Sequence, residues 1–199
     1  MSTKTFIMLA APSMIGKSTA TRLATQANPV VHVLENDILM QKLFGIVHLP
    51  RDLPIHKMDE WRTKVNVKAD CDALIRLLHR DNVSSSYGKS VILAEGYTYM
   101  NHEYRQQVKS GLAHLEHQMD YLLLRYEPPM VKQVENRTKK YEKYKWNAIS
   151  PERHEELLRA EWQNFQEPLP SEMLPFEVIR DNETLVARIS HLIISSGNE

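Results

Sequence analysis

Short apolar runs alternate with longer stretches of mixed polarity along most of the chain. The apolar runs are rich in Val, Ile, Leu and Met and contain few polar residues, a composition typical of strands that are buried on both faces. This pattern predicts five strands, at Thr5–Ala10, Val30–Leu34, Ser90–Ala94, Met119–Leu124 and Phe176–Ile179.

The stretches between these runs repeat apolar residues at helical spacing. They predict helices at Lys17–Gln26, Asp37–Leu43, Trp61–His79, Tyr104–Leu115, Val131–Tyr144, Pro151–Phe165 and Glu183–Ile194. Strands that are separated by amphipathic helices favour a parallel sheet covered on both faces. The sequence therefore predicts an α/β protein of three layers, folded as a single domain over residues 1–199.

The segment between the first strand and the first helix matches the phosphate-binding pattern G-x-x-x-x-G-K-[ST], with Ala11 in the place of the first glycine. A loop that enters a helix can aim several backbone N–H groups inward, and the helix N-terminus adds partial positive charge. Lys17 can reach the β- and γ-phosphates of ATP, and the Ser18 hydroxyl can bind Mg²⁺. The predicted ATP-binding residues are Ser13, Met14, Ile15, Gly16, Lys17, Ser18 and Thr19.

This loop departs from the pattern at two positions. Ala11 replaces an expected glycine, and Met14 replaces the glycine that many kinases carry at that position. Either substitution can reshape the loop, but neither removes the lysine or the hydroxyl. A dinucleotide-binding fold does not fit, because it requires G-x-G-x-x-G and this loop contains one glycine, Gly16.

Carboxylates follow two of the predicted strands, Asp37 after the second and Glu95 after the third. Ligands of open α/β sheets bind beyond the carboxyl ends of the strands, so both side chains are expected beside the phosphate loop. Asp37 is the predicted base that accepts the proton of an attacking hydroxyl, with a helix N-cap as its alternative role. Glu95 is predicted to hold Mg²⁺ or to bind the acceptor, with a structural salt bridge as its alternative.

A run of basic residues lies near the end of the helix predicted over Val131–Tyr144. It comprises Arg137, Lys139, Lys140, Lys143 and Lys145. An opposite stripe contains Val131, Val134, Thr138 and Tyr141, which predicts that the basic residues share one solvent-facing surface.

Phosphoryl transfer develops negative charge that cationic side chains neutralise, often from a mobile lid. A lid is accordingly expected over roughly residues 128–165. Arg137 is its best candidate for a catalytic residue, because a guanidinium group binds phosphate through two N–H groups. Either Arg153 or Arg159, on the following helix, is a candidate for a second lid arginine. The alternative for the whole run is a solvated helix face.

Composition narrows the class of protein further. The 25 basic and 25 acidic residues cancel, which disfavours a dedicated binder of duplex DNA. The single cysteine excludes an internal disulfide framework and fits a reducing compartment. The N-terminal apolar run is too short to span a membrane, so a cytoplasmic protein without a membrane partner is expected.

The phosphate loop, the Glu35–Asp37 segment, Glu95–Tyr97 and the Arg137 helix occur in an order that resembles the kinase domain of polynucleotide 5′-hydroxyl kinases and related small-molecule kinases. The resemblance implies a P-loop kinase fold that uses ATP and Mg²⁺. It also implies that Asp37 activates the acceptor hydroxyl and that Arg137 is the lid arginine.

Together these observations predict a kinase that transfers the γ-phosphoryl group of ATP to a hydroxyl. A small molecule, a nucleoside or nucleotide, and a nucleic-acid 5′ end all remain as acceptors. The neutral net charge favours a small one, because binding to a nucleic-acid backbone draws on many cationic contacts. Two alternatives stay open, a non-catalytic nucleotide-binding switch and an RNA-processing partner that uses the basic helix only for binding.

Overall fold

The computed structural model describes residues 4–27, 31–35, 91–113 and 119–196. Its strands are β1 (Lys4–Ala10), β2 (Val31–Glu35), β3 (Val91–Gly96), β4 (Met119–Tyr126) and β5 (Phe176–Ile179). Its α-helices are α1 (Lys17–Ala27), α5 (His102–Gly111), α6 (Met130–Lys143), α7 (Pro151–Gln163) and α8 (Asn182–Ser196). Two short 3₁₀ helices complete the list, η1 (Tyr97–Met100) and η3 (Pro170–Glu172).

The five strands form one parallel sheet in the order β2-β3-β1-β4-β5. This arrangement confirms the predicted α/β class. The central strand β1 pairs with β3 on one side and with β4 on the other, so the chain leaves β1 toward one edge and later crosses to the other edge. Such a reversal of strand order opens a crevice at the carboxyl ends of the strands, where ligands bind in this class of fold.

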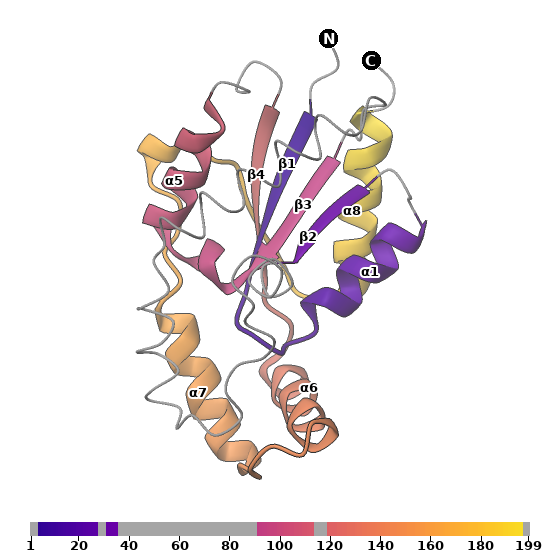
Figure 1. The fold of residues 1–199 in the computed structure, drawn as a ribbon, viewed down its shortest axis with the longest axis vertical. Helices are drawn as coiled ribbons and strands as arrows, with labels where there is room; N and C mark the ends of the chain where they lie inside the picture. The colour runs from indigo at the N-terminus through magenta and orange to yellow at the C-terminus, as the bar shows by residue number, and fades with distance from the viewer. Residues whose placement is uncertain (1–3, 28–30, 36–90, 114–118, 197–199) are drawn as a thin grey trace.

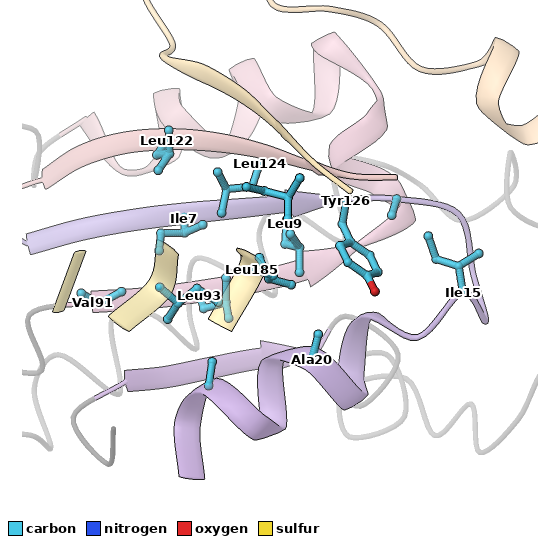
Figure 2. Packing of buried hydrophobic residues seen from close by; sticks show 14 of the residues in the cluster. Ile7, Leu9, Ile15, Ala20, Val91, Leu93, Leu122, Leu124, Tyr126 and Leu185 are labelled. Atoms are coloured by element: carbon cyan, nitrogen blue, oxygen red, sulfur yellow. The ribbon is translucent and has the colours of Figure 1, made fainter. Parts of the chain in front are cut away.

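Side chains alternate along β1 between two separate cores, as the pleat of a strand requires. Phe6 and Met8 lie in the core that packs against Tyr104 and Val108 of α5. Residues of the other parity lie in the core that packs against α1 and α8. Figure 1 shows α5 on one face of the sheet and α1 and α8 on the other, and Figure 2 shows Ile7, Leu9 and Leu93 beside Ala20 and Leu185. The three predicted layers are therefore present.

Helices α6 and α7 form a pair that extends beyond the carboxyl edge of the sheet (Figure 1). α7 begins where its sequence predicts, since the Ser150 side chain accepts a hydrogen bond from the Arg153 N–H and Pro151 occupies the first turn. The apolar stripe predicted for α6 is confirmed in part: Val134 packs against the core and Tyr141 against His154, but Val131 is 72% exposed. The helix also buries polar side chains, Gln133 and Arg137.

Several predicted boundaries move by a few residues. β3 and β4 continue to Gly96 and Tyr126, past the ends that apolar content alone suggested. The helices predicted at Asp37–Leu43 and Trp61–His79 lie outside the described residues. No helix in the described part of the chain has the length and apolar character needed to cross a membrane.

Candidate functional site

The phosphate loop connects the buried end of β1 to the start of α1 and turns at two residues with positive φ. Gly16 has a φ of +106°, where a side chain would be strained, and an added Cβ would meet Asn136 Nδ2 of α6 at 3.1 Å. The N–H groups of Thr19 and Ala20 donate to the Gly16 carbonyl, which starts the helix. The positive φ therefore favours glycine at position 16, and a side chain there would also require the Asn136 amide to shift slightly.

The two departures from the loop pattern have different consequences. Ala11 is fully buried in the core beneath α1 and keeps an ordinary backbone, so an alanine is accommodated there. Met14 takes a φ of +65°, a left-handed conformation that a side chain disfavours. A glycine would adopt this conformation without strain, which explains why many loops of this kind carry one at the position of Met14.

Lys17 lies at the first turn of α1 and is nearly buried, with 8% of its surface exposed. Its Nζ donates to the carbonyl of Pro12 at 2.7 Å and to that of Ala11 at 3.3 Å. The ammonium group is therefore held against the inner side of the loop. The Lys17 side chain also lines the cleft described below, beside the other residues of the phosphate loop, as the loop pattern predicts.

Glu95 lies near the end of β3, and both of its carboxylate oxygens bind residues of α1. Oε1 accepts a hydrogen bond of 2.5 Å from Ser18 Oγ, and Oε2 accepts one of 2.8 Å from Thr21 Oγ1. Glu95 is 4% exposed and Thr21 is 1% exposed. The structure brings Ser18 and Glu95 together as the metal-site prediction requires, and it adds Thr21, which the loop pattern does not include.

Arg137 lies beside the phosphate loop and not on the solvent face that the periodicity of α6 predicted. It is 3% exposed, and its guanidinium donates to the Ser13 carbonyl at 3.2 Å. The same group donates to both carboxylate oxygens of Glu161 on α7, at 2.7 and 2.9 Å. The neighbouring Asn136 donates to the Ile15 carbonyl at 3.0 Å. Helix α6 is thus fastened to the loop by two consecutive side chains.

Three lysines of α6, Lys139, Lys140 and Lys143, line a cleft of about 390 Å³ between this helix, the phosphate loop and the end of β3. Its lining residues are Ser13, Met14, Gly16, Lys17, Ser18, Thr19, Arg22, Glu95, Gly96, Tyr97, Asn136, Lys139, Lys140, Lys143 and Tyr144. Six of the seven predicted ATP-binding residues are among them. Ile15, the seventh, is fully buried in the core and contributes its carbonyl to the contact with Asn136.

The other predicted site residues lie elsewhere. Arg153 and Arg159 are exposed and pair with Glu156 and Glu155 of their own helix. Neither arginine lines the cleft in this structure. Asp37 lies outside the described residues, so its role as a base stays a prediction.

Sequence reasoning missed four residues of the site: Thr21 and Arg22 of α1, Asn136 of α6 and Glu161 of α7. Asn136 contacts the loop backbone and Glu161 contacts Arg137, each at a separation of more than 20 residues, where no local pattern marks them.

Removing the Glu161 carboxylate with Glu161→Gln is expected to destabilise the protein by roughly 1.5–3 kcal/mol, because a buried guanidinium loses a charged partner. Urea unfolding of this variant, of Arg137→Met and of the double variant would give their coupling in a double-mutant cycle. Arg159→Gln, which removes an exposed pair, is the matched control and is expected to change stability by less than about 1 kcal/mol. Additive effects of the two site substitutions would contradict the contact.

His154 of α7 is fully buried between α6 and α7, with its ring 4.7 Å from that of Tyr141. Burial lowers the pKa of the imidazole below its usual 6.5, and the nearby Arg137 charge lowers it further. The folded protein therefore keeps His154 neutral at a pH where the unfolded chain takes up a proton. Stability conferred by the neutral ring is complete above pH 6.5 and is lost as the pH falls toward the lowered value.

Between pH 7 and pH 5, the free energy of unfolding is expected to fall more steeply for the wild type than for His154→Phe, by up to about 1.4 kcal/mol per pH unit. Urea titrations at several pH values would measure both slopes. His191→Phe, at an exposed position, serves as the control. Equal slopes for the wild type and the His154 variant would show that the ring is protonated in the folded protein.

The sequence matches no protein-family model and no curated protein. Among solved structures, a putative kinase from Chloroflexus aurantiacus is similar at 17% identity, with a TM-score of 0.58 over 98% of this chain and 99% of that one. A shikimate kinase from Acinetobacter baumannii, at 17% identity, has a TM-score of 0.55 over 100% of this chain and 97% of that one. A gluconokinase from Sinorhizobium meliloti, at 10% identity, has a TM-score of 0.52 over 98% of this chain and 91% of that one. The chain therefore shares the fold of P-loop kinases.

Proposed function

We propose that this protein is a kinase that transfers the γ-phosphoryl group of ATP to a hydroxyl group of a small molecule or nucleotide. The observation that carries the proposal is the cleft in which Lys17, Ser18 and Glu95 meet the basic side of α6. A phosphate loop alone would serve any nucleotide-binding protein, whereas cations on the opposite wall suit a reaction in which charge moves between phosphate groups. The shared fold with a shikimate kinase and a gluconokinase supports this reading.

In this proposal the loop N–H groups and Lys17 bind the triphosphate. Lys17 exchanges its loop carbonyls for phosphate oxygens, which are stronger acceptors because they are charged. In this structure Arg137 is paired with Glu161, contacts the Ser13 carbonyl and does not line the cleft. Its proposed role is to supply positive charge to the transferring group from behind the phosphate loop. Asp37 is proposed to accept the proton of the acceptor hydroxyl.

The residues near Ser18 fit a magnesium ion. The Ser18 hydroxyl and the Glu95 carboxylate are oxygen donors already in contact, and Mg²⁺ binds such ligands with several waters. A bound Mg²⁺ would neutralise charge on the β- and γ-phosphate oxygens. Thr21 holds the second Glu95 oxygen, which fixes the orientation of the carboxylate toward Ser18.

Transfer of labelled phosphate from ATP to a panel of sugars, sugar acids, nucleosides, nucleotides and 5′-hydroxyl oligonucleotides tests this function. At least one class is expected to be phosphorylated, and Asp37→Asn is expected to lower kcat roughly 10²–10⁴-fold while KM for ATP stays unchanged. Tight binding of ATP without transfer to any of these hydroxyl compounds would contradict the proposal. That result would favour a nucleotide-binding switch.

A further inference from the structure

The cleft carries more positive charge than a nucleotide requires. Its lining includes Lys17 and four further cations, while Glu95 is its only carboxylate among the described residues. The four further cations are Arg22 of α1 and Lys139, Lys140 and Lys143 of α6. We call the last three the lysine face.

The lysine face is built into the geometry of α6. Positions 136, 139, 140 and 143 repeat at a spacing of three and four residues, so they lie on one side of a helix. Asn136 leads this side and binds the phosphate loop, which directs the lysines that follow it along the same cleft. Arg137 belongs to the adjacent side, which faces α7. The cations of α6 thus fall into two groups: Arg137 contacts α7 and the phosphate loop, and the lysine face lines the cleft.

Within the described part of the chain, no carboxylate pairs with any side chain of the lysine face. In contrast, two arginines of the described residues pair with carboxylates, Arg125 with Glu127 and Arg153 with Glu156. Like charges at helical spacing repel one another, and a bound anion would relieve that repulsion. The placement of three such lysines around one hollow therefore indicates an anionic ligand.

Magnesium-bound ATP brings about two net negative charges, which the loop N–H groups and Lys17 already face. The surplus positive charge in the cleft matches one more phosphate group, which carries about −1.5 to −2 at neutral pH. Lys143 lies over the Tyr144 ring at 5.5 Å, but a neutral sugar or nucleoside would leave Arg22 and the lysine face without an anionic partner in the complex.

We propose, on the basis of the kinase function above, that the acceptor is a hydroxyl compound that carries its own phosphate group, and that Arg22 and the lysine face bind this group. The ring of Tyr144 also lines the cleft and stacks on Trp146 at 5.3 Å. This supported ring would form an apolar wall for the rest of the acceptor. Attack of the acceptor hydroxyl on the γ-phosphorus forms the new P–O bond, ADP leaves with the electrons of the old one, and the hydroxyl proton goes to the base.

Acceptors compared in pairs that differ by one phosphate test this proposal. The pairs are ribose with ribose 5-phosphate, glycerol with glycerol 3-phosphate, and nucleosides with their 3′-monophosphates. The preferred substrate is expected to be a phosphorylated member, with kcat/KM at least about 100-fold above that of its partner.

Lys140→Gln and Lys143→Gln are expected to raise KM for that substrate about tenfold or more each, with KM for ATP within twofold. Lys132→Gln, an exposed lysine of α6 outside the cleft lining, is the matched control.

Two kinetic results would overturn the proposal. One is a preference for the unphosphorylated member of the pairs. The other is a rise of KM for ATP, in place of KM for the acceptor, in the lysine variants, since this would assign the lysine face to the nucleotide.

Failure of the kinase function is detected separately, by an absence of transfer to every acceptor. In that case, a calorimetric titration tests whether Arg22 and the lysine face bind an anion. Inorganic phosphate and glycerol 3-phosphate are titrated into protein saturated with a non-hydrolysable ATP analogue and Mg²⁺. Saturable binding that is weakened at least about tenfold in Lys140→Gln and Lys143→Gln, but not in Lys132→Gln, supports the site. An absence of saturable binding overturns it.

Discussion

The Lys17→Ala variant is expected to lose roughly 10²–10³-fold in kcat for phosphoryl transfer, with weakened binding of magnesium-bound ATP. The ammonium group lines the cleft from within the phosphate loop, and its removal takes away a charge aimed at the β- and γ-phosphates. Labelled-ATP transfer to the best acceptor measures the first effect. Titration with a fluorescent ATP analogue measures the second.

This test needs proof that the variant is folded, because Lys17 also binds the carbonyls of Ala11 and Pro12. Far-UV circular dichroism and urea unfolding supply that proof. Lys132→Ala removes a lysine from an exposed position of α6 and is expected to leave transfer and ATP binding unchanged. Undiminished transfer by a folded Lys17→Ala variant would rule out the mechanism proposed here.

The largest expected effect on stability comes from Glu172→Ala, at roughly 3–5 kcal/mol. Arg105 of α5 has no exposed surface, and its Nε and Nη2 each donate to Glu172 at 3.0 Å. Burial alone would raise the pKa of the Glu172 carboxyl, but hydrogen bonds from Arg105, the Leu169 N–H and His102 hold that pKa below its usual value. Removing the carboxylate leaves a buried guanidinium that still donates to the Tyr99 carbonyl but has lost its charged partner.

Urea unfolding measures this loss of stability, and two further variants show whether it comes from the buried ion pair. Arg105→Met combined with Glu172→Leu removes both charges and is expected to recover most of the stability, because an apolar pair needs no desolvation of ions. Glu156→Ala breaks the exposed pair with Arg153 and is expected to change stability by less than about 1 kcal/mol. A Glu172→Ala effect as small as that of Glu156→Ala would show that the Arg105–Glu172 pair is not buried in solution.

Two parts of the site were predictable from local sequence. The phosphate loop follows from residues that are adjacent in the chain, since a buried strand, Gly16, Lys17 and a helix start suffice to specify it. Glu95 was predictable because its strand ends at the same edge of the sheet as β1, where residues of neighbouring parallel strands come together.

The surroundings of Arg137 were not predictable in this way. Apolar periodicity assigned Val131 to the buried side of α6, yet that side chain is exposed and Gln133 is buried. Gln133 is satisfied by the Trp162 side chain and by the Pro128 carbonyl, at 2.9 and 2.6 Å. A helix that packs on polar neighbours can bury polar residues, provided that each finds a hydrogen-bond partner, and those partners come from distant positions.

The chain's apolar pattern and its phosphate loop determined the α/β class, the five parallel strands and the position of the cleft, because these depend on local periodicity and on residues next to one another. The tertiary structure alone decided which cations enter the cleft and which are buried against carboxylates. Arg137 turns to Glu161 while Lys140 and Lys143 face the cleft, although all three belong to one basic run. The division arises because α7 supplies a carboxylate to one side of α6 and the loop binds Asn136 on the other.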